Sequence, residues 1–331
     1  MSQARLLVTG AAGFIGARFV ESLRAHGLPA PISVDRAPAF RDRPEHREVD
    51  FGEVVDMEDL FGWLEAQQPE LAGIVHLGAC TDTTEMDEAL LRRVNLEYSQ
   101  KLWQHARATG VNFVYASSAA TYGEGHAGYD DSEAKTDTLT PLNPYGVSKL
   151  RFDQWALAEE KAGRMPKAWS GFKFFNVYGF GERHKGVMAS VVLKAFDQIR
   201  ASGGVRLFRS HNPAYRDGEQ KRDFVFVDDV VDVLHFALAR PLTRGIYNLG
   251  TGKARTFLDL VRCVFRELGV AERIEFIDTP IALRERYQYF TEADMRKLIA
   301  AGYNRPFRSL EEGVAAYVRR LRAVDARPTT G

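Results

Sequence analysis

Residues 5–16 read RLLVTGAAGFIG, an apolar run that leads directly into three closely spaced glycines. The run Arg5–Thr9 predicts a buried strand, because it is short, apolar and followed by a glycine. The next stretch, Gly13–Ala25, gathers its large apolar residues on one face and predicts an amphipathic helix. The sequence therefore predicts a strand, a tight turn and a helix in immediate succession.

The glycines of this turn are Gly10, Gly13 and Gly16, and Asp35 follows 19 residues after the last of them. Glycine lets the backbone approach a diphosphate closely, and the free N–H groups of a helix N-terminus attract that anion. A plain tight turn is the alternative, but strand, turn, helix and second strand occur here in order. The pattern predicts a dinucleotide-binding turn.

The rest of the chain alternates short apolar runs with amphipathic stretches. Further strands are predicted at 31–35, 72–77, 112–117, 169–175, 223–227, 245–248 and 274–278, and helices at 57–66, 85–109, 145–161, 187–202, 228–239, beyond Gly252 and near 310–321. This alternation predicts an α/β fold with a Rossmann-type, doubly wound parallel sheet. We expect a dinucleotide-binding domain over 1–175 with returning segments near 223–250, a smaller, chain-interleaved α/β substrate domain over 176–324, and a tail at 325–331.

The composition excludes several classes of protein. The 331 residues carry 44 Lys+Arg against 44 Asp+Glu, which argues against a nucleic-acid or membrane-surface protein with a basic excess. No apolar run is long enough for a transmembrane helix, and the N-terminus lacks the pattern of a secretory signal. Two cysteines, Cys80 and Cys263, are too few for a disulfide framework and lack metal-ligand spacing. We expect a cytoplasmic enzyme without a bound metal.

The residues around Asp35 bear on the choice of dinucleotide. An aspartate in this position ordinarily accepts a hydrogen bond from the adenosine ribose, which favours NAD. Arg36 follows directly, with Arg41 and Arg43 close behind, and guanidinium groups suit the 2′-phosphate of NADP. A solvated loop is the alternative for these arginines. They favour NADP, and NAD stays open.

A second constellation follows the predicted strand at 112–117. Ser118 stands at its end, and Tyr145 and Lys149 lie four residues apart at a helix start, so they share one helix face. An ammonium beside a phenol lowers the pKa of the phenol, which then exchanges a proton with a substrate hydroxyl near neutral pH. Ser118 is expected to hold the oxygen on which charge develops. Exposed helix surface is the alternative for an isolated pair of this kind.

Together, the glycine turn, the serine-rich strand end and the Tyr-Lys pair resemble the extended short-chain dehydrogenase/reductase family over nearly the whole chain. The resemblance implies a nicotinamide cofactor, a Ser118–Tyr145–Lys149 triad and often a nucleotide-sugar substrate. The stretch KRDFVFVDD (221–229) looks like the nucleotide-sugar segment of that family, in which Arg222 grips the diphosphate of the substrate.

Further stretches narrow the resemblance to the ADP-heptose 6-epimerases of this family, between Leu6 and about Leu321. They are HLGACTDTTE (76–85), FNVYG (175–179), HKGVMAS (184–190), YNLGTG (247–252), RYQYFT (286–291) and AGY (301–303). HKGVMAS is the most discriminating of them. The resemblance implies an ADP-heptose substrate, an epimerisation without net redox change, and a role in supplying lipopolysaccharide precursors.

Inverting an unactivated secondary alcohol requires removal of a hydride to give a ketone and its return to the opposite face. The hydroxyl proton then lies in two different places, so two acid/base groups are better placed than one. The resemblance implies that Tyr145 and Lys185 are these groups, while Lys149 tunes Tyr145 and binds the cofactor ribose. A surface loop lysine is the alternative for Lys185.

The resemblance also implies the binding residues. Cofactor contacts carry over to Phe14, Ile15, Asp35, Arg36, Leu77, Gly78, Ala79, Cys80, Thr81, Asn95, Lys149, Val177 and Lys185. Substrate contacts carry over to Ser118, Asn176, Val187, Lys194, Phe208, Arg209, Ser210, His211, Arg222 and Tyr287. Phe208 is expected to stack on adenine, and Arg222 with Tyr287 to hold the diphosphate.

The chain departs from the family pattern at several positions. The usual Pro-Arg-Glu before the His-Lys pair reads Phe180-Gly181-Glu182-Arg183 here. Val187 replaces a residue that is commonly polar, and Lys194 stands where a histidine is usual. Met57 occupies the place of a cofactor-binding lysine. These departures leave open another nucleotide-sugar epimerase, dehydratase or dehydrogenase, and a non-catalytic NADP-binding protein is a further alternative. The family suggests one tightly bound cofactor per subunit and a homo-oligomer, with a pentamer among the options.

Overall fold

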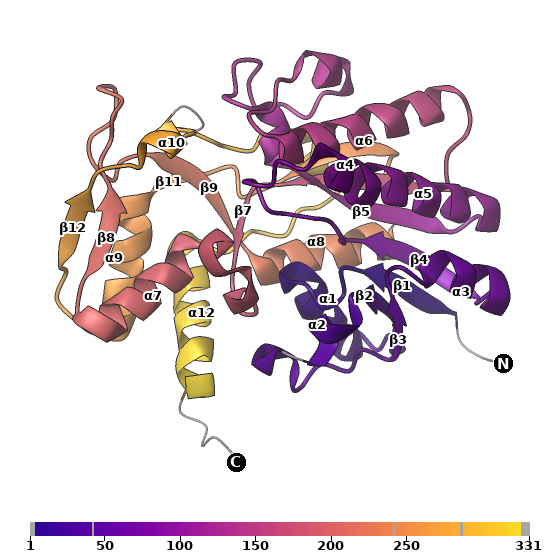
Figure 1. Ribbon diagram of the computed structural model, residues 1–331, viewed down its shortest axis with the longest axis horizontal. Helices are drawn as coiled ribbons and strands as arrows, with labels where there is room; N and C mark the ends of the chain where they lie inside the picture. Colours follow the sequence, from indigo (N-terminus) through magenta and orange to yellow (C-terminus); the bar gives the residue numbers. More distant parts are fainter. Residues whose placement is uncertain (1–3, 42, 241, 285–286, 326–331) are drawn as a thin grey trace.

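A seven-stranded sheet forms the centre of the computed structural model, which describes residues 4–41, 43–240, 242–284 and 287–325 (Figure 1). Its strands are β1 (Arg5–Thr9), β2 (Ile32–Asp35), β3 (Glu53–Asp56), β4 (Leu71–His76), β5 (Asn112–Ser118), β6 (Trp169–Phe174) and β10 (Gly245–Leu249). They lie in the order β10-β6-β5-β4-β1-β2-β3, and every neighbouring pair is parallel. The strand order reverses between β1 and β4, and such a reversal leaves a ligand crevice beyond the carboxyl ends of the strands.

Helices cover both faces of this sheet because successive side chains of each strand point to opposite faces. On one face lie α1 (Phe14–Ala25) and α8 (Val227–Ala239), and on the other α3 (Leu60–Gln67), α5 (Tyr98–Thr109) and α6 (Pro144–Lys161). In β1, for example, Val8 belongs to the core that contains Phe19 of α1, and Leu7 to the core that contains Trp103 of α5. The sheet is therefore buried on both sides.

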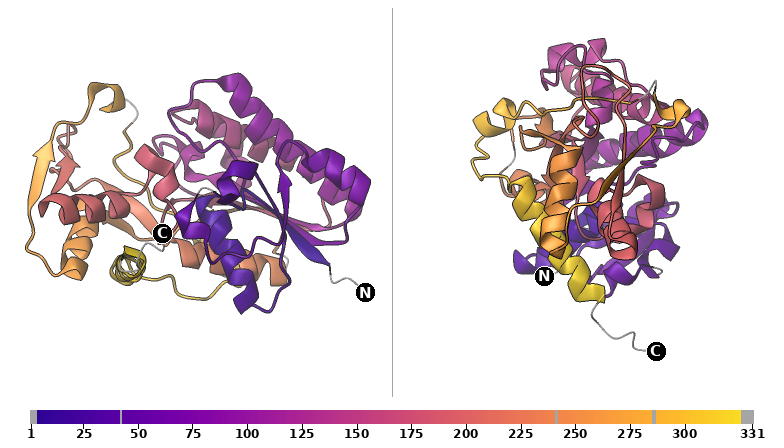
Figure 2. Two further views of the ribbon diagram at one scale, coloured as in Figure 1. Left: turned by 60° about the horizontal axis from the view of Figure 1, so that its bottom comes forward. Right: turned by 90° about the vertical axis from the view of Figure 1, so that its left-hand side faces the viewer.

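A smaller part lies beyond one end of the large sheet (Figure 2). It contains a three-stranded sheet of β11 (Ala254–Thr256), β9 (Lys221–Phe226) and β7 (Asn176–Tyr178), and a two-stranded sheet of β12 (Ile274–Ile277) and β8 (Val205–Phe208). Its long helices are α7 (Val191–Ser202), α9 (Phe257–Leu268) and α12 (Leu310–Asp325). Phe196, Val264 and Val318 join these helices in one apolar core.

Short helices complete the described chain: α2 (Ala37–Arg41), α4 (Glu88–Leu91), α10 (Ile281–Arg284) and α11 (Arg296–Ala300). The connection from β9 through α8 to β10 returns the chain from the three-stranded sheet to the edge of the large sheet. The division into two domains near residue 175 stays a prediction. The predicted tail lies outside the described residues from 326 onward, and Asp325 still belongs to α12.

The predicted α/β class with a doubly wound parallel sheet is confirmed, and two helix predictions need correction. The helix expected at 187–202 begins only at Val191, because the Ser190 hydroxyl accepts the Leu193 N–H as its N-cap and Gly186 has a positive φ of 53°. The helix expected at 85–109 begins at Glu88 and contains a π-helical segment, Arg92–Glu97. The short strands β3, β7, β8 and β11 were not predicted.

The structure also bears on membrane helices, metal sites and disulfides, which the sequence does not predict for this chain. Within the described residues, no helix is both long and apolar enough to cross a membrane. The same part of the chain has no group of three or more His, Cys, Asp or Glu side chains suited to a metal ion. Cys80 and Cys263 are both described, and both are free thiols.

His76 gives the fold a testable dependence on pH. It is completely buried between the Thr9 and Ser99 hydroxyls, at 2.6 and 2.7 Å, and burial lowers its pKa from 6.5 to about 3. The unfolded chain therefore binds more protons between these pH values, and the free energy of unfolding falls as the pH falls. We expect a contribution of up to about 1.4 kcal/mol per pH unit from this one group.

Urea unfolding of the wild type and of His76→Gln between pH 6.5 and 4.5 measures this contribution. The variant is expected to be less stable at pH 6.5 but to lose stability more slowly as the pH falls. Parallel pH dependences of the two proteins would contradict a neutral, buried His76.

Candidate active site

In the turn between β1 and α1, here called the cradle, backbone segments approach one another closely. Gly10 has a φ of +66°, and a Cβ on it would lie 2.5 Å from the Gly78 nitrogen, in the loop that follows β4. A Cβ on Gly16 would lie 2.0 Å from the Gly10 carbonyl oxygen. Gly13 is the N-cap of α1 and supplies no side chain there. The cradle lies at the ligand crevice of the sheet, where the sequence predicts that a diphosphate binds.

Asp35, at the end of β2, is tied to this cradle and flanked by positive charge. Its two carboxylate oxygens accept the Ala12 N–H at 3.1 Å and the Arg36 N–H at 2.8 Å. The Arg43 guanidinium donates to the Ala12 carbonyl, and burial lowers its pKa while the Asp35 charge opposes that shift. The structure thus brings Asp35, Arg36 and Arg43 together, whereas Arg41 is exposed at the end of α2.

The loop after β4 is held by backbone and amide contacts. The Gly78 N–H donates to the Thr9 hydroxyl at 3.2 Å. Asn95, in the π-helical segment, accepts the Cys80 N–H at 2.8 Å and donates to the Cys80 carbonyl at 3.0 Å and the Ser148 hydroxyl at 2.9 Å. Asn95 therefore joins this loop to α6. The predicted cofactor residues of the loop range from half-buried to exposed: Leu77, Gly78, Ala79, Cys80 and Thr81.

The predicted triad lies where β5 meets α6. Ser118 ends β5, Tyr145 and Lys149 are buried on α6, and the Lys149 ammonium donates to the Ala116 carbonyl at 2.9 Å. Burial lowers the pKa of Lys149 to about 8, and the Asp153 carboxylate opposes this shift. For Tyr145 the sequence expectation was wrong. Burial raises the pKa of this phenol, and the opposing influence is its hydrogen bond with Ser118 rather than the Lys149 charge.

A buried ion pair under the triad was missed by sequence analysis. Asp153 accepts the Tyr115 hydroxyl at 2.9 Å and the Ser117 hydroxyl at 2.7 Å, and its carboxylate lies 3.1 Å from the Lys173 ammonium. Lys173 also donates to the Thr121 hydroxyl at 2.6 Å. Asp153 follows Lys149 by one helical turn, and that spacing was an available signal.

Lys185 reaches the site from a separate segment, the 3-10 helix at 183–188. Its ammonium lies 5.3 Å from the centre of the Phe14 ring, just beyond the glycine turn. Burial lowers its pKa, and the Glu182 carboxylate opposes the shift. Lys194 donates to the Val187 carbonyl at 2.7 Å, while the Val187 side chain is 81% exposed. Lys185 is half-buried, and its catalytic role stays a prediction.

The segments on either side of the crevice touch near Lys185. The Thr83 hydroxyl, in the loop after β4, lies 3.9 Å from the Met188 sulfur. On β7, Asn176 is exposed and Val177 is half-buried. On α1, Ile15 is half-buried and packs against both adjoining apolar cores. These residues line the region between the cofactor cradle and the smaller part of the molecule.

The predicted substrate residues of the smaller part gather around the start of β9. Arg222 is 7% exposed, donates to the Gln288 carbonyl and lies 5.6 Å from the Tyr287 ring centre. The His211 ring centre is 6.1 Å from that of Tyr287. Phe208 ends β8. Arg222, Tyr287 and His211 thus form one cluster, which offers a cation and aromatic faces.

Arg209 and Ser210 continue from Phe208 into a loop braced by aspartates. The Arg209 guanidinium lies 4.0 Å from Asp217 and 3.9 Å from Asp278, and the Ser210 N–H donates to Asp217 at 2.8 Å. The Arg209 side chain therefore has carboxylate partners within the chain. Gln288, which sequence analysis missed, also bridges to the part of the molecule that carries the triad, by donating to the Gly123 carbonyl.

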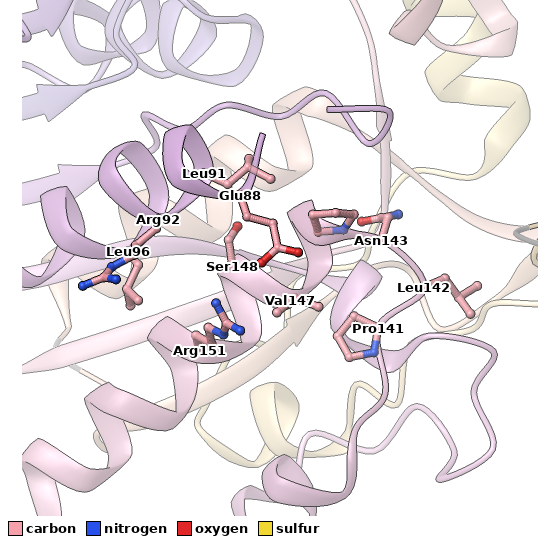
Figure 3. Close-up of a pocket in the computed structure, with 11 residues that line it drawn as sticks. Glu88, Leu91, Arg92, Leu96, Pro141, Leu142, Asn143, Val147, Ser148 and Arg151 are labelled. Carbon is pink, nitrogen blue, oxygen red and sulfur yellow. The ribbon is translucent and has the colours of Figure 1, made fainter. Parts of the chain in front are cut away.

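A hollow of about 330 Å³ lies on another face of α6 (Figure 3). Ser148, Val147 and Arg151 of α6 line it together with Leu91 and Arg92. Tyr145 and Lys149 do not line it, so this hollow is distinct from the triad.

Comparisons with known proteins agree with this geometry. The family model described as "NAD dependent epimerase/dehydratase family" matches residues 6–250. A Fusobacterium nucleatum protein named ADP-L-glycero-D-manno-heptose-6-epimerase is 42% identical over 95% of this chain and 97% of its own length. A Nitratidesulfovibrio vulgaris protein of the same name is 45% identical over 96% of this chain and 98% of its own.

Two solved structures extend the comparison. The ADP-L-glycero-D-manno-heptose-6-epimerase of Helicobacter pylori has a TM-score of 0.79 at 26% identity, covering 98% of this chain and 97% of its own. MoeE5 in complex with UDP-glucose and NAD has a TM-score of 0.75 at 27% identity, covering 98% and 100%. The chain therefore belongs to the NAD dependent epimerase/dehydratase family, in the branch that includes the proteins named ADP-L-glycero-D-manno-heptose-6-epimerase.

Proposed function

We propose that the chain converts ADP-D-glycero-D-manno-heptose to ADP-L-glycero-D-manno-heptose by inversion at carbon 6, with a tightly bound NADP and no net oxidation. The observation that carries the proposal is the pair of proton-transfer groups on separate elements. Tyr145 is buried on α6 beside Ser118, and Lys185 is half-buried on the 183–188 segment, with its ammonium over the Phe14 ring. The names of the full-length relatives at 42% and 45% identity support the substrate.

The residues present fit a nicotinamide dinucleotide. Its diphosphate suits the turn at Gly10 and Gly16, where a side chain would collide with the backbone and prevent so tight a turn at the start of α1. When bound, the cofactor supplies the hydride acceptor and donor. Lys149 lies on the same helix face as Tyr145, where it holds the ribose and keeps positive charge near the reacting oxygen.

Tyr145 and Lys185 move the hydroxyl proton in the two half-reactions. One of them removes the proton from the carbon 6 hydroxyl of the first epimer as the hydride leaves, and Ser118 donates a hydrogen bond to the oxygen that develops charge. The ketone then turns its opposite face toward the hydride donor. As the hydride returns, the other of the two residues gives a proton to the carbon 6 oxygen. Burial lowers the pKa of Lys185, which brings its neutral, proton-accepting form closer to neutral pH.

The nucleotide part of the substrate binds in the smaller part of the molecule. Arg222, buried and facing Tyr287, holds the diphosphate, because a guanidinium pairs with two phosphate oxygens at once. Phe208, at the end of β8, stacks on the adenine. The remaining proposed contacts to ribose and sugar are Ser118, Asn176, Val187, Lys194, Arg209, Ser210 and His211.

Two features leave room for a second candidate, another nucleotide-sugar epimerase, dehydratase or dehydrogenase. Val187 and Lys194, the two departures from the family pattern among the proposed substrate contacts, contact each other, since Lys194 donates to the Val187 carbonyl. MoeE5, at a TM-score of 0.75, is named as a complex with UDP-glucose and NAD. A dehydrogenase releases reduced cofactor, whereas an epimerase returns the hydride to its substrate.

A homo-oligomer, with a pentamer among the options, and a cytoplasmic location remain predictions. Sedimentation velocity of the purified protein measures the oligomeric state directly.

The acid/base assignment is tested by Tyr145→Phe and Lys185→Met. Each variant lacks one proton-transfer group, so epimer interconversion is expected to fall by about 10²–10⁴-fold, while the dinucleotide stays bound. The assay incubates purified protein with each ADP-heptose epimer and separates the products by chromatography. Retention of wild-type turnover in the double variant would refute the mechanism, and interconversion of other nucleotide sugars alone would refute the substrate.

The preference for NADP is tested by Arg43→Ala, because Arg43 and Arg36 flank Asp35 at the cradle. Loss of one charge-assisted contact to the 2′-phosphate is expected to weaken NADP binding by about 1.5–3 kcal/mol, with little change for NAD. Equilibrium titration of both cofactors measures the change, and Arg47→Ala, an exposed arginine of the same loop, is the control. Equal weakening of NAD and NADP, or copurification of NAD alone, would count against NADP.

A further inference from the structure

The segment that carries Lys185 is closed at its base by one buried carboxylate. Glu182 is completely buried, and its Oε2 accepts the Ser190 N–H at 2.7 Å. Its Oε1 accepts the Ser190 hydroxyl at 2.6 Å and the Gly179 N–H at 3.4 Å. The side chain of Glu182 thus bridges directly to Ser190, and residues 183–189 form a loop between them with Lys185 near its middle.

This loop is attached to the start of α7 at several points. Ser190, the partner of Glu182, is the N-cap of α7. Arg183 forms a bidentate ion pair with Asp197 of α7, at 2.9 and 3.0 Å. Lys194 of α7 donates to the Val187 carbonyl at 2.7 Å. The Arg183–Asp197 and Lys194–Val187 contacts are solvent-exposed and contribute little to the stability of the loop, whereas the Glu182 contacts are buried.

A carboxylate is an expensive group to bury, and its surroundings here satisfy its charge. It accepts three hydrogen bonds from N–H and O–H donors, and it lies at the N-terminal end of α7, where the helix dipole favours negative charge. The charge also acts on neighbours. It opposes the lowering of the Lys185 pKa by burial, and it adds to burial in raising the pKa of Tyr317.

Other charged groups near Lys185 do not replace this carboxylate. Lys194 lowers the pKa of Lys185 further. The neighbouring His184 lies 3.6 Å from Glu45. Among the charges that act on Lys185 in the described chain, Glu182 is the anionic one.

We propose that Glu182 is the positioning residue for Lys185: its buried carboxylate closes the 183–189 loop onto Ser190 and so fixes where the lysine ammonium meets the substrate. The proposal rests on the proposed role of Lys185 as one of two proton-transfer groups. Glu182 acts through the loop that carries Lys185, so we expect it to matter more for the half-reaction that Lys185 serves than for the one that Tyr145 serves.

The experiment measures single-turnover reduction of the bound cofactor with each ADP-heptose epimer separately, by the absorbance of the reduced nicotinamide. It compares the wild type, Lys185→Met, Glu182→Gln and Glu312→Gln. Glu312 is the control, because it also accepts the N–H and hydroxyl of one serine, Ser309, each at 2.8 Å, but at the exposed start of α12. The Glu182→Gln substitution keeps the size of the side chain, but the new amide group has one acceptor oxygen in place of two and cannot accept both Ser190 donors in the same way.

We expect Lys185→Met to block cofactor reduction by one epimer and to leave the other. Glu182→Gln is expected to slow reduction by that same epimer by roughly 10- to 100-fold, since a small misplacement of a catalytic group has effects of this size. Reduction by the other epimer stays within about two-fold of wild type, and Glu312→Gln matches wild type with both.

Two results overturn the inference, and they are distinguishable. If Lys185→Met is selective but Glu182→Gln slows both epimers equally or neither, the positioning role is wrong and the proposed function stands. If Lys185→Met is not selective, the proposed mechanism fails and the inference fails with it. If Glu182→Gln does not fold, Ser190→Ala, which removes one of the three hydrogen bonds, must show the same selectivity in weaker form.

Discussion

The buried carboxylate of Asp153 is the interaction on which the position of the triad depends. It joins three elements, because it accepts hydroxyls from β5 and pairs with Lys173 of β6 while belonging to α6. Lys173 passes the connection to Thr121, and the next residue, Tyr122, donates to Asn248 of β10 at 2.6 Å. These contacts therefore connect α6 to the carboxyl ends of β5, β6 and β10, and the triad lies where β5 meets α6. Buried networks of this kind hold a geometry because each unsatisfied member would be costly.

Although the net charge of the chain is zero, several positively charged side chains lie close to the proposed cofactor and substrate sites. Lys149, Lys185 and Arg222 are all largely buried along the proposed path of cofactor and substrate, and burial lowers the pKa of each. Only some of this positive charge is offset within the chain, by Asp153 and Glu182. Two bound anions, the cofactor and the nucleotide sugar, would offset the remaining positive charge. Zero net charge is therefore compatible with specific anionic ligands, because their binding depends on the positions of individual charges and not on the sum of all charges.

Sequence patterns predicted the features that depend on neighbouring residues and missed those that depend on contacts between distant parts of the chain. The β1–turn–α1 unit and the Tyr145–Lys149 face were readable because their determinants lie within a few residues of one another. The strands β3 and β7 were missed because pairing with β2 and β9, not their own periodicity, defines them. The start of α7 was misplaced because a capping serine and a positive-φ glycine override the helical pattern. The direction of the Tyr145 pKa was wrong because burial, which a sequence does not state, outweighs a neighbouring charge.

The return of the chain to the large sheet also bears on how the protein is made. β10 pairs with β6 through residues 245–249, after the chain has already crossed the three-stranded sheet and α8. On the ribosome, the edge of β6 therefore stays unpaired until this late segment emerges, about 70 residues after β6 itself. An open, apolar parallel edge is a template for wrong pairing between chains. Nascent chains of this protein thus carry a long window of aggregation risk, and truncation before residue 245 would make that window permanent.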